Sequence, residues 1–130
     1  MISPGMYGWT VFRWQPAKLT VDFVGYDFTG ATFKSEVRAY RDAPDPALIS
    51  LANAASPTQG ISVSVVTTDG IPTSTVEIRI DETTIEGLPF TNPRGTDWQA
   101  VWDLVITPSG GTKARWLEGT FTVRGGATQV

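Results

Sequence analysis

Apolar and polar residues alternate with a period of two along most of this chain, and this pattern constrains the fold more than any other feature of the sequence. Successive side chains of a β-strand point to opposite faces of the sheet, so the alternation predicts strands that bury one face. Turn residues recur about every 8–15 positions between the alternating segments, which is typical of an all-β fold. The alternation is clearest over residues 18–23, 33–40, 61–65 and 76–80.

Two further segments have weaker strand patterns. Residues 10–14 and 47–51 are expected at sheet edges, because prolines at positions 16, 44 and 46 interrupt their flanks. One helical signal is present: Thr83 followed three residues later by Glu86 matches a capping box. Gly87 and Pro89 follow directly, so at most one helical turn is expected there.

The length of 130 residues fits one domain with one hydrophobic core. We therefore predict a single Ig-like antiparallel β-sandwich of about seven or eight strands over residues 1–130. Residues 1–16 are expected to form an N-terminal arm or an edge strand. Residues 125–130 are expected to form a short C-terminal tail.

The last two strands are predicted to form a hairpin around the turn at residues 108–111. A two-residue loop at Ser109-Gly110 or at Gly110-Gly111 brings the apolar residues of both strands onto one face. The Ser109-Gly110 loop pairs Trp98 with Phe121, Ala100 with Gly119 and Trp102 with Leu117. The apolar residues are Trp98, Ala100, Trp102, Leu104 and Ile106 on the first strand, and Leu117, Gly119, Phe121 and Val123 on the second.

The same register places Val101, Val105 and Trp116 on the opposite face, where the alternation predicts solvent. Two interpretations are open. Either a loop or the N-terminal segment covers Trp116, or the three side chains form an apolar patch that contacts another protein. The second interpretation depends on the enrichment of tryptophan at the centres of protein interfaces.

A second candidate contact group lies in the N-terminal segment and consists of Trp9, Phe12 and Trp14. Its strand pairing is not determined by the sequence pattern, so core packing explains these aromatic residues less well than the others. Tryptophans exposed at this end of the chain would also be able to stack on sugar rings.

The chain contains no histidine and no cysteine. This composition excludes Ser-His and Cys-His nucleophilic catalysis, and metal or haem sites that need imidazole or thiolate ligands. Three carboxylate pairs, Asp42/Asp45, Asp81/Glu82 and Asp97/Asp103, lie in turns or on a polar strand face. We therefore expect no catalytic residues, no metal site and no cofactor, and the chain is predicted not to be an enzyme.

Charge is low and evenly distributed. Ten basic and thirteen acidic residues give a formal charge of −3, with no run of like charges, so no nucleic-acid partner is expected. No stretch approaches the roughly 20 apolar residues that span a bilayer, so no membrane insertion is expected.

Residues 24–38, followed by a turn and residues 48–51, resemble small tail-associated proteins of bacteriophages and prophages. Over about residues 17–124 the chain is similar to the N-terminal β-sandwich domain of phage baseplate upper proteins, which attaches receptor-binding parts to the tail. The second half carries motifs in the same order, over residues 78–80, 83–88, 102–107 and 111–123.

The resemblance implies a non-enzymatic structural subunit of a phage virion, located in the tail or baseplate after assembly in the host cytoplasm. Its partners would be other virion proteins in a multi-copy homo- or hetero-oligomeric assembly. It would act as an adaptor or cement protein that joins its neighbours or a receptor-binding fibre or spike. A capsid decoration protein is the near alternative. From another class, a carbohydrate-binding module would use Trp9, Trp14 or Trp116 to bind a host-surface glycan.

Overall fold

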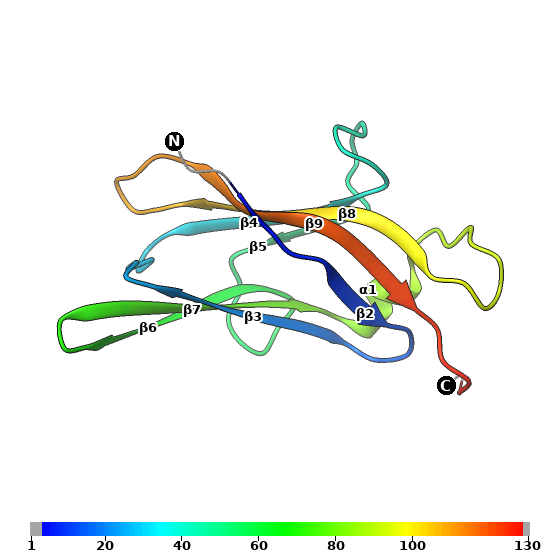
Figure 1. Cartoon of the computed structure of the whole chain (residues 1–130), viewed down its shortest axis with the longest axis horizontal. Helices are drawn as coiled ribbons and strands as arrows, with labels where there is room; N and C mark the ends of the chain where they lie inside the picture. The colour runs from blue at the N-terminus through cyan, green and yellow to red at the C-terminus, as the bar shows by residue number, and fades with distance from the viewer. Residues whose placement is uncertain (1–3, 129–130) are drawn as a thin grey trace.

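The computed structural model describes residues 4–128, which fold into two β-sheets packed face to face (Figure 1). The larger sheet has the strand order β1-β9-β8-β4-β5, with β2 also paired to β9, and the smaller sheet has the order β3-β7-β6. This arrangement confirms the predicted all-β sandwich, whereas the Ig-like topology stays a prediction. The strands are β1 (Gly5–Met6), β2 (Trp9–Phe12), β3 (Ala17–Val24), β4 (Thr32–Arg38), β5 (Ile49–Ala52), β6 (Gly60–Thr68), β7 (Ile71–Ile80), β8 (Trp98–Thr107) and β9 (Ala114–Arg124).

The core forms where the apolar faces of the two sheets meet. On β7, the buried residues Val76, Ile78 and Ile80 alternate with the more exposed Glu77 and Arg79, as the period-two pattern predicts. Burial of each such aliphatic side chain stabilises the fold by about 1.5–3 kcal/mol. The largest fully buried side chains are Phe28, Phe33, Phe121, Ile61, Ile78, Ile80, Ile85, Leu104 and Ile106.

The two weakly predicted strands are present with shifted limits. β2 ends at Phe12 instead of residue 14, because the backbone turns at Trp14, whose φ of 70° lies in the left-handed region. β5 begins at Ile49 instead of residue 47, just after the prolines that flank it.

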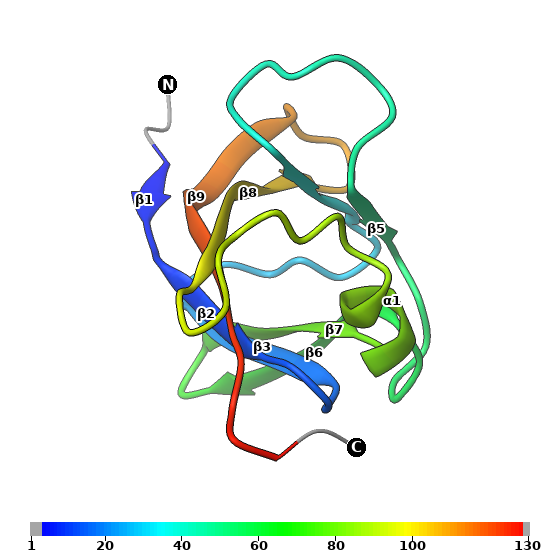
Figure 2. The same cartoon turned by 90° about the vertical axis from the view of Figure 1, so that its right-hand side faces the viewer.

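The N-terminal segment forms the outer strand of the larger sheet. β1 and β2 follow β9 in one parallel register, with Gly5 opposite Leu117 and Trp9 opposite Phe121. This parallel pairing corrects the expectation of wholly antiparallel sheets: β2 does not form a hairpin with β3, because the next turn carries the chain into the smaller sheet. Figure 2 shows β1 and β2 at one margin and β5 at the other. Residues 1–3 of the expected arm and 129–130 of the expected tail lie outside the described residues.

The β8–β9 hairpin corrects the register expected from a Ser109-Gly110 loop. Trp98 pairs with Val123, Ala100 with Phe121 and Trp102 with Gly119, two residues further along β9, which is the pairing that the alternative loop at Gly110-Gly111 gives. The cause is the turn, which covers residues 108–113 instead of the two residues Ser109-Gly110. Both apolar sets nevertheless share the inner face of the sheet, because a β-bulge at the Leu104/Val105 step adjusts the register.

The helical turn is present as α1 (Glu82–Glu86), but the predicted capping box is wrong. Asp81 occupies the N-cap position and makes no side-chain capping bond, and Thr83 lies inside the helix. Glu86 bonds to Arg13 instead of reaching back to the helix start. The helix is fixed to the sandwich mainly by Ile85, which is fully buried.

Candidate protein-contact surfaces

Trp116 lies at the β-bulge of β9, and this position removes it from the predicted surface patch. Leu104 pairs with Leu117 and Val105 pairs with Arg115, so Trp116 is the extra residue and has no partner on β8. Its indole ring packs edge to face against Phe23 and Phe28, with ring centroids 5.6 and 5.3 Å apart. The expectation that Trp116 shares the outer face is wrong, because strict alternation does not hold through a bulge.

The β3–β4 connection covers Trp116, as one of the two sequence interpretations proposed. Tyr26 in this connection meets the indole edge to face at 4.9 Å. Ser74 on β7 holds the connection in place: its Oγ accepts the Phe28 N–H at 2.9 Å and donates to the Tyr26 carbonyl at 2.8 Å. Trp116 is therefore half-buried, and its Nε1–H has no hydrogen-bond partner within residues 4–128.

Val101 and Val105 remain on the outer face of the larger sheet, where the pattern placed them. In the β4–β8 pairing, Val101 lies opposite Arg38 and Val105 opposite Lys34. Both valines are half-buried, surrounded by longer charged side chains. They do not join Trp116 in one apolar patch.

The structure also separates the three residues of the N-terminal group. Trp9 is only 5% exposed and packs against Trp102 and Phe121, with ring centroids 5.3 and 5.5 Å apart. It is therefore a core residue, which corrects its assignment as a contact residue. Phe12 is 47% exposed, because it points to the opposite side of β2.

Trp14 belongs to a polar clamp that holds the β2–β3 turn. Its backbone N–H donates to Glu86 Oε2 at 3.0 Å, and Arg13 donates from Nε to Glu86 Oε1 at 2.8 Å. The Arg13 guanidinium lies over the rings of Trp14 and Phe90, 4.8 and 4.4 Å from their centroids. The bond from Arg13 is the main cause of a lowered Glu86 pKa, which burial partly opposes.

A hollow of about 660 Å³ lies over the outer face of the larger sheet, between β1 and the β4–β5 loop. Its lining includes Met6 on one side, Tyr40 on the other, and Asp103, Arg115 and Glu118 on the floor. Figure 2 shows the β4–β5 loop standing above the larger sheet. Residues 40–45 of this loop line one side of the hollow.

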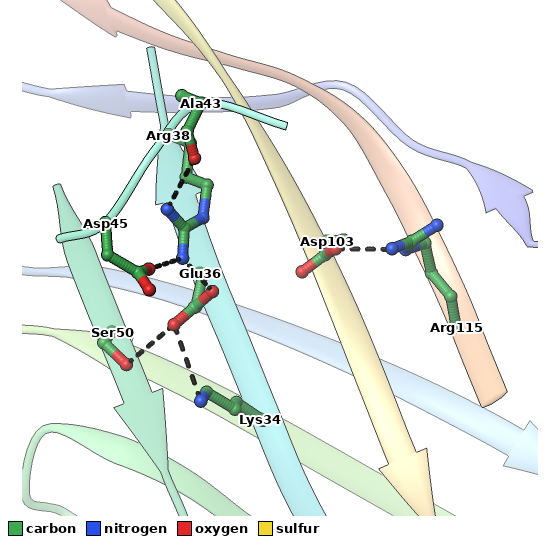
Figure 3. Close-up of polar contacts among 8 residues, drawn as sticks. All are labelled: Lys34, Glu36, Arg38, Ala43, Asp45, Ser50, Asp103 and Arg115. Carbon is green, nitrogen blue, oxygen red and sulfur yellow. Dashed lines mark hydrogen bonds and ion pairs between the residues drawn. The ribbon is translucent and has the colours of Figure 1, made fainter. Parts of the chain in front are cut away.

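Charged side chains on this face are paired with one another (Figure 3). Arg38 donates to Asp45 Oδ1 at 2.6 Å, to Glu36 Oε1 at 3.0 Å and to the Ala43 carbonyl at 2.9 Å, which fastens the β4–β5 loop to β4. Hydrogen bonding to Arg38 lowers the pKa of Asp45. Asp103 accepts a bond from Arg115 Nε at 3.0 Å. Three of the carboxylates considered as acid–base pairs, Asp45, Asp97 and Asp103, thus have arginine partners.

Sequence analysis missed a contact candidate at the tip of the β6–β7 hairpin, which forms one end of the molecule (Figure 1). Val24 and Val66 both lie opposite Thr73, and Ile71 lies opposite Thr68, so these side chains share the outer face. Val24, Val66 and Ile71 are 66%, 64% and 53% exposed. The Asp69-Gly70 pair is the sequence feature that could have predicted this hairpin, because Asp-Gly is typical of a two-residue turn. The φ angles of 52° at Asp69 and 77° at Gly70 fit that turn.

Comparison of the sequence with models of protein families and with curated proteins identifies no match. Across residues 4–128 no group of three or more acidic, histidine or cysteine side chains is arranged to hold a metal ion. Within the same range, no helix has the length and apolar character that crossing a lipid bilayer requires.

Proposed function

We propose that this chain is a non-enzymatic structural subunit of a phage virion, in the tail or baseplate, where it joins neighbouring virion proteins or a receptor-binding fibre or spike. The observation that carries the proposal is the exposed aliphatic tip formed by Val24, Val66 and Ile71 on the projecting end of the smaller sheet. Clustered aliphatic side chains at an exposed tip are typical of surfaces that another protein covers.

The distribution of exposed apolar residues supports contact with more than one neighbour. Met6, Tyr7 and Phe12 are 76%, 44% and 47% exposed along the N-terminal strands, which belong to the other sheet. An adaptor or cement protein needs two separate contact surfaces, and these two sets lie on different sheets. A capsid decoration protein would need the same property, so the structure favours neither location.

Ring packing weighs against the carbohydrate-binding alternative. Trp9 is buried, Trp14 lies beneath the Arg13 guanidinium, and Trp116 is covered by Tyr26. A sugar-binding platform needs an open aromatic face, and all three tryptophans proposed for that role contact protein side chains. Titration with host polysaccharide is expected to leave the tryptophan fluorescence unchanged, whereas saturable quenching would favour the carbohydrate-binding module.

The position of the protein in assembled particles tests the proposal directly. Gold-labelled antibody against the chain is expected to mark the tail of purified phage particles in electron micrographs. Label on the head would move the assignment to capsid decoration, and particles without the chain would overturn the proposal.

Hairpin-tip variants test the surface. The double variant V66D/I71D is expected to fold normally, because both side chains are mostly exposed, but to be incorporated into particles at least tenfold less. The matched control is Thr67→Asp, which adds a charge at the same exposed tip but keeps both aliphatic side chains. Equal incorporation of all three proteins would show that the tip makes no contact.

A further inference from the structure

The outer edge of β2 carries backbone groups without partners in its own sheet. Tyr7 N–H donates to the Glu118 carbonyl and Arg13 N–H to the Arg124 carbonyl, each at 2.9 Å. In a parallel ladder the bonding residues alternate, so Trp9 and Val11 also face β9. The N–H and C=O groups of residues 8, 10 and 12 therefore point away from β9, and all three residues are exposed.

This edge lacks the features that normally prevent strands from pairing between molecules. Residues 5–12 include no charged residue and no proline. By contrast, β3 at the edge of the smaller sheet carries Lys18 and Asp22. Natural proteins protect free edges with such charges, with proline or with bulges. The N-terminal edge is therefore available for an additional strand.

The sequence of β2 is complementary to itself when two copies run antiparallel. A register centred on Thr10 pairs Thr10 with its own copy and pairs Gly8 with Phe12 in both directions. Residues 8, 10 and 12 then all occupy hydrogen-bonded positions, which uses each outward backbone group. A side chain built at Gly8 would meet no atom within 4 Å, so this position has room for the Phe12 ring of the opposing strand.

We propose that two copies of this chain pair through β2 across a two-fold axis at Thr10 and join their larger sheets into one continuous sheet. The inference rests on the proposed function, since it assigns a partner to one of the two contact surfaces. A second copy fits this edge because a two-fold interface needs the same surface to complement itself. The pairing would cover the exposed Phe12 ring, and it brings no charged residue of β1 or β2 opposite another.

Introduced cysteines test the register, because the full chain has no cysteine of its own. Hydrogen-bonded antiparallel partners have Cα atoms about 5.5 Å apart, within disulfide range. Thr10→Cys is therefore expected to form a covalent dimer under mild oxidation, read on a non-reducing gel. Phe12→Cys alone is expected to form no covalent dimer, because residue 12 faces Gly8 of the other copy. A mixture of Phe12→Cys and Gly8→Cys is expected to form one. Failure of Thr10→Cys to cross-link, or equal cross-linking by Phe12→Cys alone, would overturn the register and the proposal.

Sedimentation of the full chain without cross-links tests the dimer itself. The unmodified protein is expected to sediment as a concentration-dependent dimer, and Thr10→Lys to raise the dissociation constant at least tenfold, because two lysines would face each other at the axis. Thr20→Lys is the matched control: Thr20 is an exposed strand residue of the smaller sheet, so this variant should leave the dimer intact. Circular dichroism checks that both variants are folded.

A protein that is monomeric at all concentrations overturns the proposal. If the protein is monomeric and Thr10→Lys reduces its incorporation into particles, the edge of β2 binds a strand of another protein. This outcome also overturns the dimer. The gold-labelling experiment distinguishes the two failures. A monomer found in the phage tail overturns the dimer alone, and a dimer absent from particles overturns the proposed function alone.

Discussion

The indole Nε1–H of Trp102 donates a hydrogen bond of 2.9 Å to the backbone carbonyl of Tyr7. Trp102 lies in the core on β8, and Tyr7 lies between β1 and β2, so the bond spans β9. The ring of Tyr7 also meets Trp102 edge to face at 6.3 Å. Gly119 makes this contact possible, because the Tyr7 carbonyl group occupies the space that a Cβ atom at position 119 would fill.

Gly119→Ala is expected to displace the N-terminal strand. A Cβ atom at this position would lie 2.1 Å from the Tyr7 carbonyl oxygen and 2.7 Å from its carbon, and neither backbone atom can move without breaking the bond to Trp102. We expect a loss of about 1–3 kcal/mol in the free energy of unfolding, measured by urea denaturation. Gly125→Ala is the control, since no atom lies within 4 Å of its built Cβ. Equal stability of the two variants would contradict the role of Gly119.

Glu86→Gln is expected to loosen the β2–β3 turn. The carboxylate accepts bonds from both the Arg13 side chain and the Trp14 backbone, and the variant keeps the shape but loses the charge. The pair is partly exposed, so the cost is expected to be about 1 kcal/mol, measured by thermal or urea unfolding. Glu82→Gln is the control on the same helix. A variant as stable as the parent would show that the clamp contributes nothing.

The same clamp predicts a pH dependence. Hydrogen bonding to Arg13 lowers the pKa of Glu86 in the folded protein relative to the unfolded chain. The stabilisation is therefore fully present above the unfolded pKa and is lost as the pH falls through the folded pKa. We expect the parent protein and Glu86→Gln to begin to converge in stability near the unfolded pKa of about 4.3. Their stabilities become equal only below the lowered pKa of folded Glu86. A difference between the two that stays constant down to pH 2 would contradict this assignment.

The sequence predicted the all-β class because period-two alternation depends only on which face of a strand is buried. It failed where a local backbone feature changed that alternation. The pairing of Trp98 with Phe121 was wrong because turn length sets the register, and Gly and Ser residues permit more than one length. The surface position of Trp116 was wrong because a bulge inserts one residue without changing the composition of the strand.

The candidate contact residues were harder to predict than the strands. Trp9 and Phe12 lie on opposite sides of β2. Alternation shows that a strand has two different faces, but the buried face of β2 could be identified only from its pairing with β9. The apolar tip at Val66 and Ile71 was missed for a different reason. Both strands of the hairpin continue beyond their buried portion, so the exposed residues lie outside the amphipathic segments.

Ser74→Ala is expected to release the connection that covers Trp116. Ser74 is fully buried, and its hydroxyl is bonded to backbone groups of both Phe28 and Tyr26. Removal leaves a buried N–H unpaired, which costs about 1–3 kcal/mol in urea unfolding. Hydrogen exchange of the Phe28 amide is expected to become faster in the variant. Ser64→Ala, an exposed position on β6, is the control, and equal exchange rates in the two variants would contradict the role of Ser74.

The two aromatic residues at the ends of β2, Trp9 and Phe12, are expected to differ sharply in their contribution to the free energy of unfolding. Trp9→Ala removes a buried ring from the contacts with Trp102 and Phe121 and should cost about 3–5 kcal/mol. Phe12→Ala removes a ring that is 47% exposed and should cost well below that, about 1 kcal/mol or less. Urea unfolding, extrapolated to low protein concentration to exclude association, measures both. Similar losses would show that the assigned faces of β2 are wrong.

Two substitutions at Trp116 separate its ring contacts from its polar atom. Trp116→Ala removes the edge-to-face contacts with Phe23, Tyr26 and Phe28 and is expected to cost about 2–3 kcal/mol, less than the roughly 3–5 kcal/mol of a fully buried tryptophan. Trp116→Phe keeps an aromatic ring and removes an indole N–H that has no partner among residues 4–128, so it should cost much less. Equilibrium unfolding in urea gives both values. If the alanine variant loses almost none of the free energy of unfolding, the indole ring does not make these packing contacts in solution.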